Sequence, residues 1–134
     1  MSVVYLDASA LVKLVVREAE SEALFASLQG FDHRVTSLVG RIELERAVRR
    51  RRGSDAIATS GGLDAVLSST VLIPVDVATA GIAAAVSPLD LRTMDAIHLA
   101  TMLALQPELE CCFCYDHRLA TAVGERGIEV RAPQ

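Results

Sequence analysis

Short apolar runs that suit buried strands alternate with longer segments of helical periodicity, and this alternation limits the possible folds more than any other feature of the chain. The expected strands are 2–6, 34–36, 71–75, 111–115 and 128–131. The expected helices are 8–16, 19–28, 38–53, 54–69 with an interruption at 61–62, 77–86, 93–105 and 117–125. Strands that alternate with helices favour right-handed crossovers and a parallel sheet covered on both faces. The sequence therefore predicts an α/β fold.

Length and composition indicate one domain that spans residues 1–134. A chain of 134 residues with 51% hydrophobic content can bury a continuous core without disulfides or a structural metal. It contains no apolar run of 18 residues, so no membrane span is expected. The first residues lack a basic region and reach a charge at Asp7, which is untypical of a signal peptide. We therefore expect a cytoplasmic protein.

Four acidic residues stand where a predicted strand ends or a predicted helix begins: Asp7, Glu43, Asp95 and Asp116. Taken singly, an aspartate in such a place is often only a helix cap. In parallel α/β folds, however, ligand sites lie outside the carboxyl ends of the strands, so these side chains are expected to converge. Clustered carboxylates repel one another unless a hard cation such as Mg²⁺ or Mn²⁺ binds their oxygens. The pattern predicts metal-dependent chemistry on phosphate.

Two further side chains flank the predicted ligands. Ser9 follows Asp7 by two residues, so its hydroxyl can position that carboxylate or cap the next helix. His98 lies one helical turn after Asp95 and shares roughly its face. A carboxylate site for Mg²⁺ has little need of imidazole, so His98 is expected to support the site or the core, most simply through a backbone hydrogen bond.

The distribution of basic residues leaves two interpretations open. A net charge of −4 argues against broad, sequence-independent binding to nucleic acid. Five arginines nevertheless follow Glu43 within a few turns: Arg46, Arg49, Arg50, Arg51 and Arg52. They either complement the carboxyl end of a helix or contact an RNA backbone.

Three cysteines, Cys111, Cys112 and Cys114, fall within one predicted strand. A structural zinc site needs about four ligands, usually in pairs from separate segments, and no histidine has a matching spacing. They are interpreted as small buried side chains.

Four segments, in order along the chain, resemble PIN-domain ribonucleases, especially VapC toxins of bacterial toxin–antitoxin pairs. The segments are Leu-Asp-Ala-Ser-Ala-Leu-Val-Lys-Leu at 6–14, Thr-Ser-x5-Glu at 36–43, Leu-Arg-Thr-Met-Asp-Ala-Ile-His-Leu-Ala at 91–100 and Tyr-Asp-x-Arg-Leu at 115–119. The resemblance implies a three-layer α/β/α fold with a central parallel sheet and a Mg²⁺- or Mn²⁺-dependent endoribonuclease. It also implies a metal site formed by Asp7, Glu43, Asp95 and Asp116, a homodimer, and neutralisation by a small VapB-type antitoxin.

The chain departs from this family pattern at two places. Cys114 stands where many relatives carry Thr or Ser, so a different hydrogen bond to Asp116 is expected. The segment around Leu38 lacks an acid that some relatives place before the glutamate, so no further ligand is assigned there.

Two other functions are consistent with an α/β unit rich in acids. A receiver-like phosphoryl acceptor uses a lysine to contact phosphate, but Lys13, the chain's one lysine, is expected within the first helix and away from the strand ends. A catalytically silent PIN-like interaction module would use the acids as helix caps and the arginines as a contact surface for a protein partner. That module remains the main alternative to a nuclease.

Overall fold

The computed structural model describes residues 1–52 and 60–134, and its centre is a five-stranded sheet in which all pairings are parallel. The strands are β1 (Val3–Leu6), β2 (His33–Ser37), β3 (Val71–Ile73), β4 (Leu109–Phe113) and β5 (Val130–Arg131). Their order across the sheet is β3-β2-β1-β4-β5, so β1 is central and the chain crosses over between parallel neighbours. The predicted α/β fold with a parallel sheet is confirmed.

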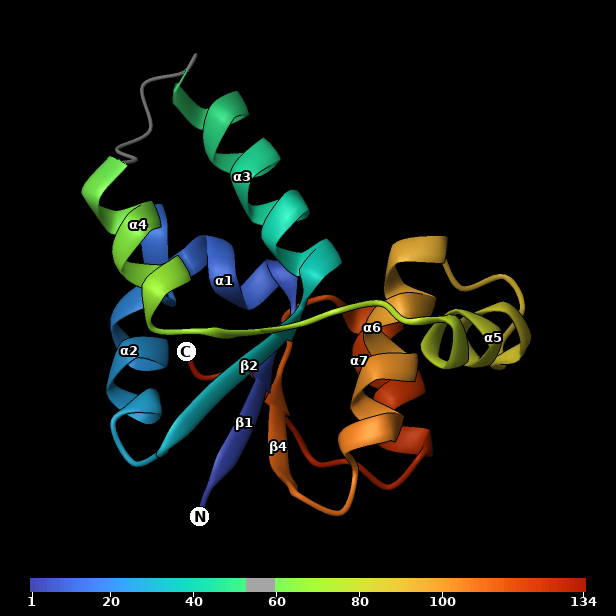
Figure 1. Cartoon of the computed structure of the whole chain (residues 1–134). Helices are drawn as coiled ribbons and strands as arrows, with labels where there is room; N and C mark the ends of the chain where they lie inside the picture. The colour runs from blue at the N-terminus through green and yellow to red at the C-terminus, as the bar shows by residue number, and fades with distance from the viewer. Residues whose placement is uncertain (53–59) are drawn as a thin grey trace.

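Helices cover both faces of this sheet and complete a three-layer α/β/α arrangement (Figure 1). They are α1 (Ala8–Val15), α2 (Ser21–Leu28), α3 (Leu38–Arg52), α4 (Ser60–Ser68), α5 (Val77–Ala85), α6 (Thr93–Leu105) and α7 (His117–Glu125). The alternation of side chains along β1 separates two cores. Val4 and Leu6 pack with α1 to α4, whereas Tyr5 packs with α6 and α7.

The predicted boundaries that fall on described residues agree with the structure within two residues, but one prediction is wrong. β4 ends at Phe113, two residues earlier than expected, because Leu6, the last residue of β1, pairs with Phe113. The expected interruption at 61–62 does not occur, because α4 runs without a break from Ser60 to Ser68. Packing of α4 against α1 outweighs the low helix propensity of glycine there. The part of that prediction on 54–59 lies outside the described residues.

The position of Pro74 in the sequence predicts an edge strand or a strand end, and the structure agrees. β3 lies at one edge and ends immediately before Pro74, which is where a residue without a backbone N–H is tolerated. Asp76 then caps α5 by accepting a hydrogen bond from Thr79 N at 2.7 Å. In the described part of the chain, no helix has both the length and the apolar character needed to cross a membrane.

Candidate active site

All four predicted ligand residues lie at or just beyond the carboxyl edge of the sheet. Asp7 follows β1 and caps α1, and Asp116 caps α7 by accepting hydrogen bonds from Arg118 N and Leu119 N. Glu43 lies in the second turn of α3, and Asp95 lies in the first turn of α6. Asp7 and Asp116 are thus helix caps, and the same geometry directs them to the edge where ligands bind in parallel sheets.

Electrostatics shows that these carboxyl groups share one region. Burial raises the pKa of Asp95, and the negative charge of Asp116 raises it further. Glu43 and Asp7 act in the same direction, while His98 lowers the pKa of Asp95. Because the interaction between charges weakens with distance, the other three acids lie near enough to Asp95 to act on its charge. The structure therefore brings together residues that are far apart in sequence, and their role as metal ligands stays a prediction.

Asp7 is the most enclosed of the four, with a relative exposure of 3%. Its Oδ1 accepts hydrogen bonds from Ser9 Oγ at 2.6 Å and from Ala10 N at 3.1 Å, so the predicted contact with Ser9 is present. Burial raises the pKa of Asp7 despite these donors. Ser9 Oγ also accepts a hydrogen bond from Tyr115 N at 2.9 Å, which ties the segment after β4 to this carboxylate.

Cys114 makes the expected hydrogen bond to Asp116, and the acceptor is the backbone oxygen, at 3.4 Å from Sγ. The thiol also donates to Asp7 Oδ2 at 3.2 Å, a contact that the sequence did not predict. The carboxylate of Asp116 is occupied in capping α7, which leaves Asp7 as the acid nearest the thiol. All three cysteines are buried and free, as interpreted from the sequence.

His98 is almost fully buried and bridges two side chains rather than a backbone group, so that part of the prediction is wrong. Its Nδ1 lies 2.6 Å from Tyr5 Oη, and its Nε2 lies 2.6 Å from Glu43 Oε1. Sequence reasoning did not single out Tyr5. The available signal was a tyrosine in a buried apolar strand, whose hydroxyl must find a polar partner inside the protein.

The donor set fits a hard divalent cation that takes few ligands directly from the protein. Within the described residues, no group of three or more His, Cys, Asp or Glu side chains is arranged to hold a metal ion. Mg²⁺ commonly uses only one or two protein carboxylates and keeps several waters. A cation among these acids would also relieve the repulsion that, after burial, raises the pKa of Asp95.

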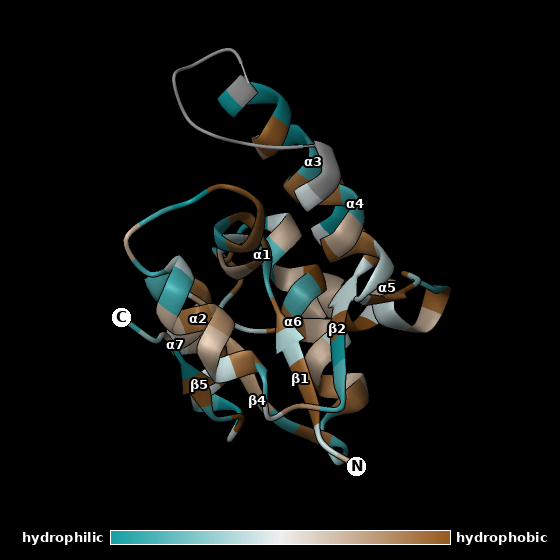
Figure 2. Cartoon of the chain, turned by 90° about the vertical axis from the view of Figure 1, so that its left-hand side faces the viewer, coloured by the Kyte–Doolittle hydropathy of each residue, from teal (hydrophilic) through white to brown (hydrophobic). Residues whose placement is uncertain are grey.

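The arginine run Arg49 to Arg52 lies at the carboxyl end of α3, which is the end of the helix that lies away from the sheet (Figure 1). Arg46, Arg49, Arg50 and Arg51 are exposed, and Arg51 approaches Glu18 at 3.9 Å. At about 1.5 Å per helical residue, Arg49 is roughly 9 Å beyond Glu43 along the helix axis. Figure 2 shows hydrophilic residues along this end of α3. Side chains at this position can complement the carboxyl end of the helix and can contact a long substrate.

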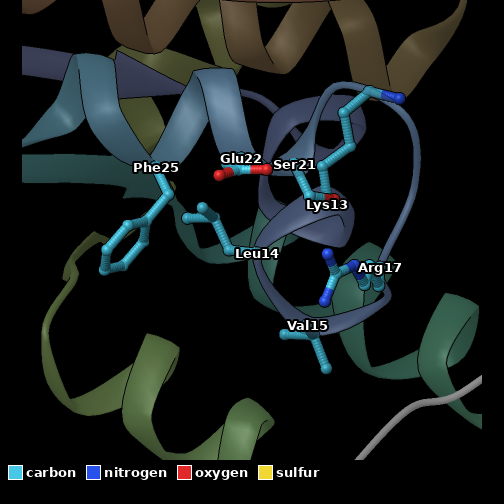
Figure 3. Close-up of a pocket in the computed structure, with 7 residues that line it drawn as sticks. All are labelled: Lys13, Leu14, Val15, Arg17, Ser21, Glu22 and Phe25. Carbon is cyan, nitrogen blue, oxygen red and sulfur yellow. The ribbon is translucent and has the colours of Figure 1, made fainter.

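The four carboxylates lie outside the hollow between α1 and α2. That hollow, of about 380 Å³, lies between α1 and α2 and includes Leu14, Arg17 and Phe25 (Figure 3). None of the four acids lines it. Asp95 and Asp116 are partly exposed, so solvent reaches the candidate active site at the edge of the sheet.

Known proteins similar to this chain agree with the resemblance found in the sequence. Residues 4–120 match the PIN domain family. Ribonuclease VapC46 of Mycobacterium tuberculosis (strain ATCC 25618 / H37Rv) is 41% identical over 133 residues, with 99% of each chain covered. Ribonuclease VapC47 of M. tuberculosis (strain CDC 1551 / Oshkosh) is 35% identical, with 97% of this chain and 96% of the relative covered.

Solved structures share the fold at low sequence identity. VapBC2 from Rickettsia felis, bound to a DNA fragment from its promoter, aligns with a TM-score of 0.72 at 10% identity over 98% of this chain and 99% of that chain. The M. tuberculosis toxin VapC20, described as cleaving the sarcin-ricin loop, aligns with a TM-score of 0.66 at 14% identity over 89% and 94%. From the family match and the identity over nearly the full length, this chain belongs to the PIN-domain family and to the VapC ribonucleases within it.

Proposed function

We propose that this protein is a divalent-cation-dependent endoribonuclease that acts as the toxin of a type II toxin–antitoxin pair. The observation that carries the proposal is that Asp116, Glu43 and Asp7 all lie near enough to Asp95 for their charges to raise its pKa, in addition to burial. Relatives named as ribonucleases align with nearly the whole chain, which supports RNA as the substrate. The silent interaction module is not favoured, since helix capping accounts for Asp7 and Asp116 but not for the placement of Glu43 and Asp95.

The acids of the site have different roles. Asp95 and Asp116 are partly exposed at the open edge and are placed to meet a cation together with a phosphate. Asp7 lies at the buried bottom of the site, where hydrogen bonds from Ser9 and Cys114 hold its two carboxylate oxygens in place.

A bound Mg²⁺ or Mn²⁺ would supply the positive charge that polarises a phosphoryl oxygen and lowers the pKa of the attacking water. Without such charge, the acids would repel the phosphodiester backbone. We propose that Arg46 and Arg49 to Arg52 contact that backbone outside the reacting phosphate.

The proposed partners follow from the family. A VapB-type antitoxin would neutralise the acids, and the aligned R. felis structure is a VapBC complex. We also propose a homodimer and a single domain over residues 1–134.

RNA cleavage by wild type, Asp7→Asn and Asp95→Asn, with EDTA, Mg²⁺ or Mn²⁺, tests the proposal. Wild type should cleave only with a cation, leaving a 5′-phosphate and a 3′-hydroxyl. Each variant should lose roughly 100-fold or more in rate, the scale expected when a group that stabilises transition-state charge is removed. The matched control is Asp64→Asn, an exposed acid on α4 that should cleave normally. Cleavage without a cation, or no cleavage by any protein in the set, would contradict the proposal.

A further inference from the structure

We infer that Tyr5 and His98 are positioning residues that hold the Glu43 carboxylate in one orientation for cation binding. This inference rests on the proposed function, because it assigns Glu43 to the cation site. It adds a relay of side chains from Tyr5 through His98 to Glu43. The relay begins on the face of β1 that carries Tyr5, which is opposite to the face that carries Val4 and Leu6.

The relay is short and enclosed. Tyr5 is fully buried, His98 has a relative exposure of 1%, and the Glu43 side chain has a relative exposure of 29%. Both contacts of the imidazole are 2.6 Å long. The Tyr5 and His98 rings also meet edge to face, with centroids 5.7 Å apart and planes at 86°. The ring of His98 is therefore fixed by packing as well as by hydrogen bonds.

The donors and acceptors of the relay are compatible with one another. Ser37 N donates to the Tyr5 oxygen at 3.1 Å, and Tyr5 Oη and His98 Nδ1 share a hydrogen bond of 2.6 Å. An ionised carboxylate only accepts hydrogen bonds, so His98 Nε2 carries the proton and donates it to Glu43 Oε1. This assignment follows from the hydrogen-bond pattern. It makes the backbone of β2 the fixed end of a chain that terminates on Glu43.

The path of α3 brings the carboxylate to the imidazole. Gly40 lies three residues before Glu43, and a Cβ atom at Gly40 would come within 3.2 Å of His98 Cε1. Glycine thus permits α3 to approach α6 closely enough for the 2.6 Å hydrogen bond between His98 and Glu43. A glutamate has three side-chain torsions to restrict, so a hydrogen bond to one oxygen leaves the second oxygen better defined for a cation.

Three substitutions separate positioning from packing. His98→Gln retains an N–H group near the position of Nε2, whereas His98→Asn is too short to reach Glu43. Tyr5→Phe removes only the hydroxyl and keeps the ring. We expect His98→Asn and Tyr5→Phe to weaken Mn²⁺ binding by roughly 10-fold or more, the scale of losing a group that orients a metal ligand, and His98→Gln to recover most of it.

Mn²⁺ binding should be measured without RNA, by the paramagnetic resonance signal of free Mn²⁺, alongside kcat, KM and thermal unfolding. Thr101→Val is the matched control, because Thr101 is a buried hydroxyl on α6 that donates to Ile97 O at 2.8 Å. That variant should lose stability while keeping wild-type Mn²⁺ affinity. If His98→Asn does not fold, Tyr5→Phe and His98→Gln still provide the comparison.

The possible outcomes distinguish this inference from the proposed function. Wild-type Mn²⁺ affinity in Tyr5→Phe and His98→Asn would overturn the positioning role, even where Asp95→Asn abolishes Mn²⁺ binding and cleavage. An equal loss of affinity in His98→Gln, His98→Asn and Thr101→Val would overturn it as well, since the effect would then follow stability. If Asp95→Asn keeps both Mn²⁺ binding and cleavage, the proposed function itself fails.

Discussion

At the scale of single residues, the carboxylate of Asp7 shows two opposing influences on its charge. Burial raises the pKa of Asp7, while hydrogen bonds from Ser9, Cys114 and Ala10 lower it. The thiol is the weakest of these donors. Burial also raises the pKa of Cys114, so the thiol stays protonated and continues to donate. The ease with which Asp7 ionises therefore depends on the residue at position 114.

Cys114→Ser should make Asp7 easier to ionise, because a hydroxyl donates a stronger hydrogen bond to a carboxylate than a thiol does. We expect the pH profile of Mn²⁺ binding to move to lower pH, with a gain in affinity of about 2- to 5-fold on its acidic limb. Titration with Mn²⁺ across a pH series measures this. Cys112→Ser is the control, since Cys112 is buried in the same strand and no hydrogen bond joins it to Asp7 in the described structure. A shift to higher pH in Cys114→Ser would contradict the expectation.

At the scale of elements, α3 can lie close to β2 and α6 because Gly40 has no side chain. A Cβ atom there would overlap Thr36 Oγ1 and crowd His98. Gly40→Ala should therefore lower the free energy of unfolding by about 1–3 kcal/mol, the usual cost of overpacking. Urea denaturation measures the change.

The control for this prediction is another glycine inside a helix. Gly81 lies within α5, where a Cβ atom would meet nothing within 4 Å. Gly81→Ala should raise the free energy of unfolding by up to about 1 kcal/mol through helix propensity. If Gly40→Ala raised the free energy of unfolding as Gly81→Ala does, helix propensity rather than the close approach of α3 would determine the result.

The far end of α3 provides a test of the two interpretations of the arginines. The double substitution Arg49→Gln and Arg50→Gln should weaken RNA binding for all sequences if these side chains bind phosphates. It should also reduce the dependence of log K on log[salt] by roughly 0.7 for each phosphate of a single-stranded RNA that the variant no longer neutralises. Arg34→Gln, near the amino end of β2, is the control and should leave that slope unchanged. An unchanged slope in the double variant would favour helix capping.

At the scale of the whole molecule, periodicity and local signals define most of the architecture but not the side-chain pairings inside it. The pattern predicts the sheet and the bounds of α6, because their apolar residues recur at regular spacing. It misplaces the end of β4, because the apolar run through Cys114 and Tyr115 continues past the last residue that pairs with β1.

The same division applies to the candidate site. The convergence of the acids is predictable, since parallel strands end at one edge. The hydrogen bond between Tyr5 and His98 is not, because it joins residues 93 positions apart and no periodicity specifies which buried side chains meet.

Stability should depend on pH in opposite ways with and without a cation. The pKa values of Asp7 and Asp95 are raised in the folded protein, chiefly by burial. Above the unfolded-state value of about 3.9, the metal-free folded state therefore holds more protons than the unfolded state, and stability falls as pH rises through the folded pKa values. A cation binds only the ionised carboxylates, so the stabilisation that it provides grows over the same interval.

Thermal unfolding from about pH 4 to pH 8, with EDTA or with Mn²⁺, measures both trends. Asp95→Asn should flatten the decline in EDTA and remove most of the gain with Mn²⁺, because it deletes the group on which the other three charges act. At pH 7 in EDTA the variant should unfold at a temperature no lower than that of wild type. Its unfolding temperature should rise by roughly 2–4 °C for each kcal/mol of repulsion relieved. The exposed Asp64→Asn variant corrects for general charge effects, so the difference between the two variants isolates the site. The expectation is contradicted if the difference in unfolding temperature between wild type and Asp95→Asn varies neither with pH nor with Mn²⁺. Such a result would show that these acids neither repel one another nor share a cation.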